Sequence, residues 1–364
     1  MKLFLIGRYS SSKILTGPEK VALNLFLTLH NRGLDPTFIT YYFKDFNHST
    51  LFSRLWGKET ISEEPLIIRL GIVRILWYIL SKRVDIIHVV TFERFLIPII
   101  SIKFLIKIKL VYTLHGIVRD EINNAYNKPN KFSKFKDRFL ESMLLRNSDY
   151  IVFLSEQSKK FAEKYCDLSN SKFCIIPNGV SPNFFVQNVS ISPQNKLKIV
   201  FYNGIGNNID RGLDVLVNVL DKSSLKIDLF IIGKIKKIDT KNISIHLIEP
   251  MDESALILFL KDKNIFVNSV TPSTFSLMAL EAMAAGLIIV ISDRTGLSEY
   301  IENGVNGFIY KSENLFELIQ ILNDIQSGLV DYEFIRRNVQ KTCCELNWNS
   351  IAGRYVELYN KLLS

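Results

Sequence analysis

Short apolar runs alternate along the chain with longer stretches in which apolar residues recur at helical spacing. In the first half these short runs are continuous, which is expected of parallel strands that are covered on both faces. The predicted strands of this half are KLFLI, PTFITYY, VDIIHVV, LVYTLHG, DYIVFLS and KFCIIP. Residues 17–32 predict an amphipathic helix that ends at Gly33. The alternation predicts a doubly wound α/β domain.

The pattern pauses after PNGVSPNFF, where the polar stretch VQNVSISPQNK predicts a linker, and then it begins again. Further strands are predicted at residues 197–202, 225–232, 243–247, 264–267, 287–291 and 307–310. The chain should therefore form two Rossmann-like domains, residues 1–183 and 184–345, that face each other across a cleft. Residues 348–363 carry an apolar helical stripe, and we expect residues 346–364 to cross back to the first domain.

Charge is divided unevenly between the two halves. Residues 1–183 hold 27 Lys and Arg against 16 Asp and Glu, a net charge of +11, whereas residues 184–364 hold 18 against 20. Basic surfaces attract nucleic acid or anionic membranes. No nucleic-acid-binding motif is visible, and apolar residues such as Trp77 lie among the basic ones, which favours an anionic membrane surface as partner and no nucleic acid. The alternative is that Trp77 and its apolar neighbours are core and that the basic residues are solvated.

Several classes of protein are disfavoured. The four cysteines (Cys166, Cys174, Cys343 and Cys344) show no metal-ligand spacing, so we expect reduced thiols and no metal site. The first strands of the two halves lack a following G-x-G-x-x-G, which argues against a dinucleotide dehydrogenase. The N-terminal apolar run is too short for a signal peptide, and no run approaches a spanning helix. We expect a cytoplasmic protein, peripheral at the inner face of the cell membrane.

One segment suggests a binding site. Residues 268–286 read NSVTPSTFSLMALEAMAAG between two predicted strands, and their hydroxyl residues predict a helix that opens near Phe275. The first N–H groups of such a helix suit a phosphate. Glu281 lies about one turn further along, where its carboxylate could bind the hydroxyls of a ribose. The alternative is an ordinary helix cap, with Glu281 paired to a neighbouring Lys or Arg.

Taken in order, the motifs resemble the retaining GT-B glycosyltransferases of family 4. The resemblance rests on TGPEKVALNLFLTLHNRG, DIIHVV, VYTLHG, IVFLSEQSKKF, IIPNGVSPNFF, FYNGIGNNIDRGLDVLV, the segment at 268–286, SDRTGLSEYIENGVNGFIY and NWNSIAGRYVELYNKLL. It implies a metal-independent enzyme without a cofactor. Such an enzyme moves a sugar from a nucleoside-diphosphate sugar to a glycan or lipid-linked glycan with retention, in cell-surface polysaccharide synthesis. The acceptor would bind mainly to the first domain and the donor to the second.

The resemblance also implies roles for particular residues. In the second domain, the donor diphosphate would lie at the helix that follows Phe275, where backbone N–H groups around Ser276 and Leu277 contact it. Glu281 would bind the ribose, and Arg211 would neutralise the leaving diphosphate, which also passes close to Gly204.

In the first domain, Gly17 would approach the donor phosphate and His115 would lie beside the reacting sugar. The alternative for His115 is a histidine at the end of a strand that is hydrogen-bonded to the backbone.

Two positions depart from the family pattern. Ser273 stands where the family has the first of two glutamates, a residue that contacts the donor sugar. Ile205 follows Gly204 where the family often has an arginine. These departures keep open a second hypothesis, a catalytically weak GT-B-like subunit that binds a nucleotide or a glycan and supports a partner transferase. A third hypothesis, a sugar-nucleotide epimerase of the same fold, fits the transferase motifs less well.

Overall fold

The chain forms two α/β units. The computed structural model describes residues 1–10, 12–41, 50–92, 96–103, 105–117, 131–169, 171–185, 196–204, 211–233, 238–268 and 271–364. The first unit contains the described residues up to 177 together with 348–364, and the second contains those of 178–347. The division expected from the sequence, with breaks after residues 183 and 345, differs from this one by a few residues at each break.

The first unit is built on an eight-stranded sheet in the order β3-β4-β2-β1-β5-β6-β7-β8. Its strands pair in parallel except for β3, which runs antiparallel to β4. The strands are β1 (Leu3–Ile6), β2 (Thr37–Tyr41), β3 (Lys58–Ser62), β4 (Ile67–Leu70), β5 (Ile86–Val89), β6 (Lys109–Leu114), β7 (Tyr150–Phe153) and β8 (Phe173–Ile175). Four of the eight, β1, β4, β5 and β7, are wholly buried, as is typical of continuous apolar strands in the middle of such a sheet.

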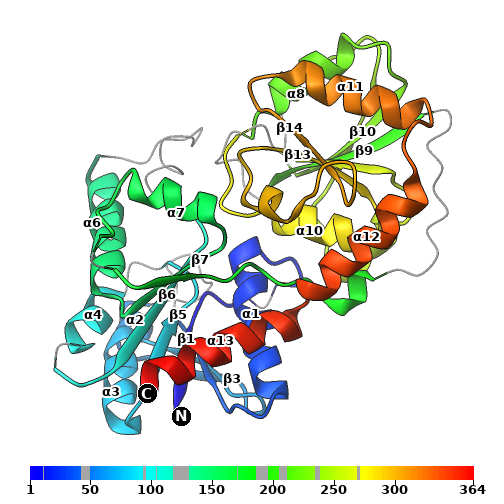
Figure 1. Ribbon diagram of the computed structural model, residues 1–364. Coiled ribbons are helices and arrows are strands. Elements are labelled where there is room, and N and C mark those ends of the chain that lie inside the picture. The colour runs from blue at the N-terminus through cyan, green and yellow to red at the C-terminus, as the bar shows by residue number, and fades with distance from the viewer. Residues whose placement is uncertain are drawn as a thin grey trace. The chain divides into compact units, whose positions relative to one another are not determined.

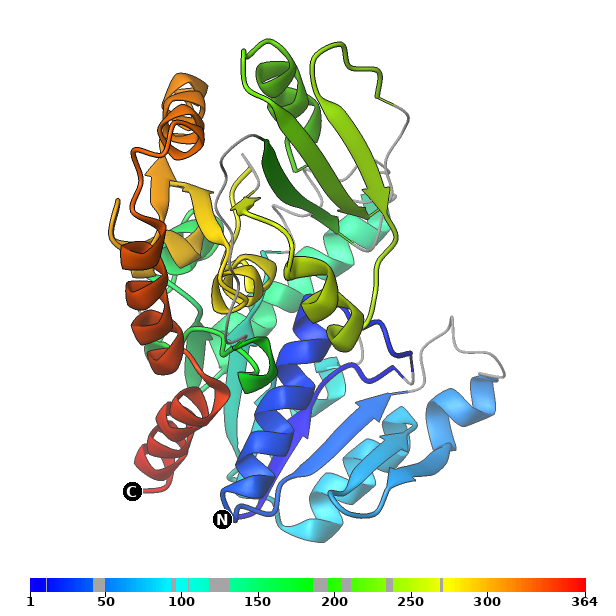
Figure 2. The ribbon, with the colours of Figure 1, turned by 90° about the vertical axis from the view of Figure 1, so that its right-hand side faces the viewer.

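Helices lie on both faces of this sheet (Figure 1). They are α1 (Gly17–Asn31), α2 (Leu51–Trp56), α3 (Ile72–Lys82), α4 (Ile97–Lys103), α6 (Lys131–Asn147), α7 (Glu156–Glu163) and α13 (Trp348–Leu363). Helices α2, α3, α4 and α6 contact one another in that order, whereas α1 packs against the C-terminal α13 (Figure 2). Arg32, after α1, donates to the backbone oxygen and to Oδ1 of Asn349 at 2.8 and 2.6 Å. The prediction that the final helix packs on the first domain is confirmed.

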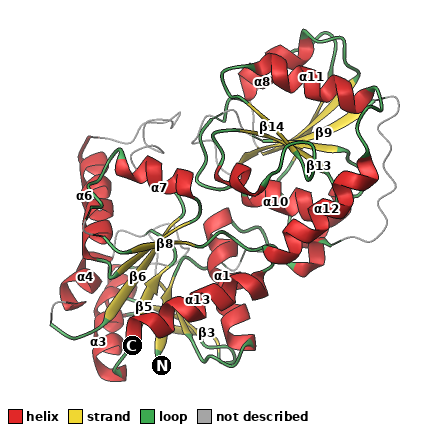
Figure 3. Cartoon of the chain, in the orientation of Figure 1, coloured by secondary structure: helices red, strands yellow, loops and turns green. Residues whose placement is uncertain are grey.

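The second unit holds a six-stranded, all-parallel sheet in the order β11-β10-β9-β12-β13-β14. Its strands are β9 (Leu197–Gly204), β10 (Ile227–Gly233), β11 (Ser244–Ile248), β12 (Ile265–Val267), β13 (Ile288–Ser292) and β14 (Phe308–Tyr310). Its helices are η2 (Pro182–Phe184), α8 (Leu213–Asp221), α9 (Glu253–Leu260), α10 (Leu277–Ala284), η3 (Gly296–Tyr300), α11 (Leu315–Gln326) and α12 (Tyr332–Glu345). Helices α8 and α11 contact each other, as do α10 and α12, on opposite sides of the strands (Figure 3).

The two ends of the second unit lie side by side. The backbone N–H of Val180, near its beginning, donates to the carbonyl of Leu346, near its end, at 2.8 Å. Val180 also forms a parallel bridge with Asn347. The chain therefore enters and leaves this unit at one place.

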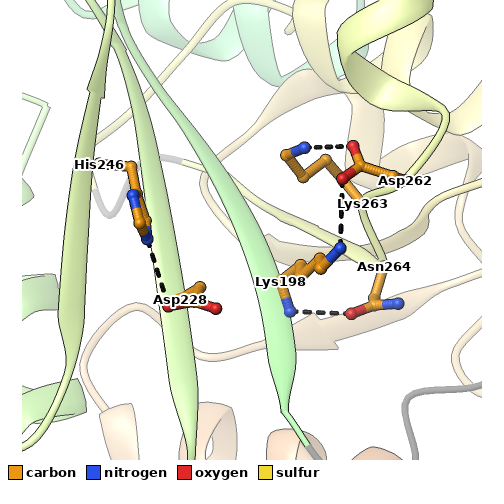
Figure 4. Close-up of polar contacts among 6 residues, drawn as sticks. All are labelled: Lys198, Asp228, His246, Asp262, Lys263 and Asn264. Atoms are coloured by element: carbon orange, nitrogen blue, oxygen red, sulfur yellow. Dashed lines mark hydrogen bonds and ion pairs between the residues drawn. The ribbon is translucent and has the colours of Figure 1, made fainter.

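The amino ends of β9, β10 and β12 are closed by internal polar contacts (Figure 4). Lys198 donates through its backbone N–H to Asn264 Oδ1 at 2.8 Å and through Nζ to Asp262 at 3.2 Å. Asp228 accepts a hydrogen bond from His246 at 3.2 Å in the neighbouring strand. Since these charged groups satisfy one another, a ligand site is better sought at the opposite, carboxyl edge of the sheet.

Each sheet has one point at which the order of its strands reverses. In the first unit this point lies between β1 and β5, and in the second it lies between β9 and β12. Open α/β sheets bind their ligands beyond the carboxyl ends of the strands at such a point. In the part of the chain that the structure describes, no helix has both the length and the apolar character needed to cross a membrane.

Candidate functional site

Hydrogen bonds from Asn268 hold the start of α10 at the switch point of the second sheet. Asn268 directly follows β12 and is buried. Its Oδ1 accepts from the Ser276 hydroxyl at 3.0 Å, and its Nδ2 donates to Thr295 Oγ1 at 2.7 Å. Ser276 is the N-cap of α10 and accepts the Ala279 N–H at 3.4 Å. The free N–H groups of the first turn, including that of Leu277, therefore begin at the edge where a ligand is expected.

The helix begins slightly later than the sequence predicts. Its N-cap is Ser276 rather than a residue at Phe275, and Gly286, with a φ of 91°, follows its end as expected. The side chain of Phe275 is buried and meets the ring of Tyr300 edge-on at 6.2 Å. Phe275 therefore anchors the loop in front of the helix.

Ser273 is built into the same loop. Its N–H donates to the carbonyl of Arg294 at 3.1 Å, and its own carbonyl accepts from Gly296 at 3.0 Å. Its hydroxyl donates to the carbonyl of Phe275 at 3.0 Å. Ser273 thus supports the loop that precedes the helix, whether or not it also contacts a sugar.

Glu281 and Arg211 lie within electrostatic reach of one aromatic side chain, Tyr202 in β9. The guanidinium carbon of Arg211 is 5.8 Å from the centre of the Tyr202 ring. Burial raises the pKa of Tyr202, the charge of Arg211 lowers it and the charge of Glu281 raises it again. Glu281 is only 4% exposed in α10. The charges of both residues predicted for the donor therefore act on the same tyrosine, Tyr202.

Tyr202 was not among the residues that the sequence predicts for the site. It stands near the carboxyl end of β9, directly after the apolar run Ile199–Phe201 and next to the switch point. A tyrosine, whose ring carries a polar hydroxyl, at the ligand-binding end of a central strand is the feature that could have indicated Tyr202 from the sequence.

Gly204 ends β9 with a left-handed φ of 93°. A Cβ atom added to the neighbouring Gly233 would lie 2.4 Å from the Gly204 carbonyl oxygen, so the two strands approach too closely there for side chains. The left-handed backbone conformation at Gly204 is thus sufficient to explain a glycine at this position. The departure at Ile205 lies outside the described residues.

In the first unit, the loops after β1 and β5 are joined at the switch point. The N–H of Arg8 donates to Thr91 Oγ1 at 2.8 Å. The buried Glu19 accepts from the N–H and the hydroxyl of Thr16, both at 2.8 Å, and lies 3.3 Å from Arg8 Nε. Gly17 is the first residue of α1, and a Cβ added to it would meet no heavy atom within 4 Å. The helix therefore begins beside open space.

His115 directly follows β6 in the first unit and is half-buried. Burial lowers the pKa of its imidazole to about 4, so the ring is neutral near pH 7.

The predicted site residues are divided between the two units. Gly17 and His115 belong to the first unit, and the other predicted site residues belong to the second. Within the described ranges, no group of three or more His, Cys, Asp or Glu residues is placed to hold a metal ion.

The chain is similar in sequence to proteins named as glycosyltransferases. The chain is 22% identical over 283 residues to the uncharacterized glycosyltransferase MJ1069 of Methanocaldococcus jannaschii, a match that covers 71% of this chain and 69% of the relative. It is 32% identical over 114 residues to N,N'-diacetylbacillosaminyl-diphospho-undecaprenol alpha-1,3-N-acetylgalactosaminyltransferase of Campylobacter jejuni. That second match covers 30% of this chain and 29% of the relative.

Solved structures share the fold over the full length. Sucrose-phosphate synthase from Thermosynechococcus elongatus matches with a TM-score of 0.74 at 15% identity, covering 100% of this chain and 99% of that one. HepE from Anabaena, solved in complex with UDP-glucose, matches with a TM-score of 0.69 at 17% identity over 99% and 100% of the two chains. At these identities the likeness shows the fold, two parallel-sheet α/β domains of GT-B type.

Two family models match successive parts of the chain. Residues 15–184 match the model described as Glycosyltransferase Family 4, and residues 185–335 match the model described as Glycosyl transferases group 1. The two matches follow the order of the two α/β units, and the chain therefore belongs to the GT-B glycosyltransferases of family 4 type.

Proposed function

We propose that this glycosyltransferase uses a nucleoside-diphosphate sugar and transfers the sugar with retention to a glycan acceptor. The observation that carries the proposal is the grouping of Arg211, Tyr202 and Glu281 at the switch point where α10 begins. A cation and the N–H groups at a helix N-terminus suit a diphosphate, and a buried carboxylate suits the hydroxyls of a ribose. HepE, which shares the fold, was solved with UDP-glucose, and this supports a donor of the same chemical class.

The chemistry follows from where negative charge develops. As the bond from the sugar to the diphosphate breaks, the leaving group gains charge, which Arg211 and the dipole of α10 stabilise without a metal ion. The acceptor hydroxyl enters on the face that the diphosphate leaves, so the configuration at the sugar carbon is retained. We assign His115, as a neutral imidazole, to a place beside the reacting sugar.

The proposed acceptor is a lipid-linked glycan of cell-surface polysaccharide synthesis. The relative from Campylobacter jejuni is named for an acceptor on diphospho-undecaprenol, which supports this class. An acceptor of this kind stays at the membrane, so the enzyme has to reach the membrane surface.

The first unit carries exposed apolar side chains suited to that surface. Trp77 on α3 is 64% exposed, which makes the alternative that it belongs to the core wrong. Phe135 and Phe139 on α6 are 69% and 52% exposed and stack on each other at 6.4 Å. These helices belong to the row of neighbouring helices α2, α3, α4 and α6, in the basic half of the sequence. Basic and aromatic side chains together favour peripheral binding to an anionic bilayer.

The donor is tested by calorimetry and by hydrolysis of a panel of UDP-, GDP- and dTDP-sugars. We expect one nucleotide to bind and its sugar to be released slowly, and both signals to weaken in Arg211→Ala. The control is Arg294→Ala, in the same unit, which removes an arginine that is ion-paired with Glu313 at 2.7 Å. Absence of binding to every nucleotide and nucleotide sugar would contradict the proposal.

A second candidate function is a nucleotide-binding subunit with little activity of its own. It is favoured by Ser273, whose hydroxyl already has a partner within its own loop, and by the uncharged Ile205. Nucleotide binding without release or transfer of sugar, to lipid-linked acceptors as well, would establish this alternative.

The membrane surface is tested by sedimentation with vesicles. We expect binding to vesicles that contain anionic lipid, weakened by salt because each basic residue contributes about 1 kcal/mol within a Debye length. Phe135→Ser with Phe139→Ser should reduce binding. Phe316→Ser, at an 86% exposed phenylalanine of the second unit, should leave it unchanged. Equal binding to neutral and anionic vesicles rules this part of the proposal out.

A further inference from the structure

A buried hydrogen-bond network joins the C-terminal helix to the middle of the first sheet. His88 in β5 is fully buried, and both of its ring nitrogens have partners. Nδ1 lies 2.7 Å from the hydroxyl of Tyr359, and Nε2 lies 2.8 Å from Oγ1 of Thr113 in β6. The hydroxyl of Tyr355 lies 3.3 Å from the same Thr113 oxygen. Both tyrosines belong to α13 and are buried, so a helix at the end of the chain completes the hydrogen bonding of two strands.

The imidazole in this network stays neutral. Burial, with a smaller effect from the charge of a protonated His115, lowers the pKa of His88 to about 3. A neutral imidazole has one donor and one acceptor nitrogen, and leaving either unmet in so buried a place is costly. The rings of Tyr355 and Tyr359 also pack against the imidazole, at 5.2 and 5.8 Å. Hydrogen bonds and ring packing together therefore hold the imidazole of His88 in place.

This network reaches the strand end that carries His115. Thr113, in β6, stands two residues before His115, which directly follows the end of that strand. The charge of a protonated His115 contributes to the lowered pKa of His88, so His115 lies within electrostatic reach of the network. A shift of Thr113 would be transmitted to His115 over two residues of backbone.

We propose that Tyr359 and Tyr355 of α13 are positioning residues, which fix the place of His115 through His88 and Thr113. The inference rests on the proposed function, in which His115 lies beside the reacting sugar. The C-terminal helix then contributes to the geometry of the site as well as to the packing of the first unit.

Other contacts of α13 allow packing and positioning to be separated. Lys361 is hydrogen-bonded to Tyr150 in β7 and lies 5.5 Å from the centre of its ring. This contact also fastens α13 to the sheet, yet it includes none of the four residues of the network. Tyr150→Phe is therefore a matched control for Tyr359→Phe, because each removes one tyrosine hydroxyl that links α13 to a strand.

The experiment records the imidazole ¹⁵N signals of the full-length protein and the turnover of the nucleotide sugar. Signals are assigned with His88→Gln and His115→Gln. In Tyr359→Phe we expect the signals of both rings to shift, and kcat to fall by about tenfold or more while KM for the donor stays within about twofold, as for a misplaced reacting group. Thr113→Val should act in the same way, and Tyr150→Phe should change neither the signals nor kcat.

Two results would overturn the inference. One is His115 signals in Tyr359→Phe that coincide with those of the wild type. The other is an equal change in Tyr150→Phe, which would mean that only the docking of α13 matters. A wild-type protein that turns over no nucleotide sugar contradicts the proposed function instead, since the His115 signals decide the positioning role without any turnover.

Discussion

The ring of Tyr202 lies 5.8 Å from the guanidinium carbon of Arg211, at the carboxyl end of the central strand β9. Contacts of this kind stabilise a cation by about 0.5–2 kcal/mol, more when the pair is shielded from water. The second charge that acts on Tyr202 is the carboxylate of Glu281. Both of the charged groups assigned to the donor therefore act on one tyrosine.

Arg211→Ala should lower turnover about a hundredfold or more, because loss of one electrostatic contact to developing charge costs about 3 kcal/mol. Arg211→Lys keeps the charge but not the planar group, and it should recover part of the rate. Steady-state kinetics with the donor found in the panel measure both variants. Wild-type turnover in Arg211→Ala would show that the leaving group is stabilised elsewhere.

Glu281→Ala should weaken binding of the bare nucleotide by about 1.5–3 kcal/mol, since a charged acceptor for the ribose hydroxyls is lost. Glu281→Gln keeps the shape of the buried side chain and should lose less. Calorimetry with the nucleoside diphosphate gives the difference. An unchanged affinity in a folded variant would remove Glu281 from the ribose site.

Ser273→Ala separates two roles of a hydroxyl that donates to the Phe275 carbonyl. If Ser273 also contacts the sugar, the rate or the preference among donors changes while the affinity for the bare nucleotide stays nearly the same. An equal loss of affinity for the nucleotide and for its sugar would instead assign Ser273 to the loop alone. Competition between nucleotide sugars measures the preference.

Gly17→Val should leave the fold intact and weaken donor binding about tenfold. A Cβ atom added to Gly17 meets no heavy atom of the described residues within 4 Å, so the protein itself leaves room there. A phosphate that approaches this backbone would meet the added methyl groups. The midpoint of thermal unfolding should change by no more than about 2 °C. Gly17→Ala should show a smaller loss of donor affinity than Gly17→Val. Donor affinity equal to that of the wild type in both variants would exclude a phosphate at this helix.

The buried histidine of β5 should make the protein sensitive to acid. The pKa of His88 is about 3 in the folded chain against 6.5 in the unfolded chain, so the unfolded chain binds a proton first as the pH falls. The contribution of His88 to the free energy of unfolding is therefore fully present above pH 6.5 and is lost as the pH falls toward 3. At pH 4 this loss amounts to about 3 kcal/mol.

Urea unfolding at pH 7.5 and at pH 4 measures this decrease. His88→Gln should be less stable at pH 7.5 and should lose less on acidification. His246→Gln, at an exposed imidazole in β11, controls for the loss of a histidine. An equal loss on acidification in the wild type and in His88→Gln would contradict the prediction.

Much of the fold could be predicted from the sequence because its strands are covered on both faces. The buried runs predicted at residues 264–267 and 287–291 correspond to β12 and β13, and the helix predicted at 348–363 is α13. The short buried strand β4, Ile67–Leu70, was not predicted, and neither was its neighbour β3, Lys58–Ser62. Strand β3 lies exposed at the edge of the sheet, so it needs no apolar run, and its pairing with β4 determines it.

Some residues of the candidate site could likewise be predicted from the sequence, and others could not. Ser276 and Glu281 belong to one continuous segment whose capping pattern can be seen in the sequence. His88 and Tyr359 are 271 residues apart, and only the return of the last helix brings them together. No local pattern predicts a contact of that kind. Tyr202 was missed because its role depends on Arg211 and Glu281, which are neighbours in space only.

The bond between Val180 and Leu346 makes the second unit a module inserted into the first. Its two ends meet, so the described residues of 178–347 form one stretch of chain that begins and ends at the same place. Exchange of that stretch between related chains leaves every strand of the first sheet, together with the helix that closes it, unaltered. Under the proposed function, such an exchange combines an existing acceptor-binding unit with a new donor-binding unit in a single recombination event, and chimeras joined at these two positions are the natural form for engineered enzymes.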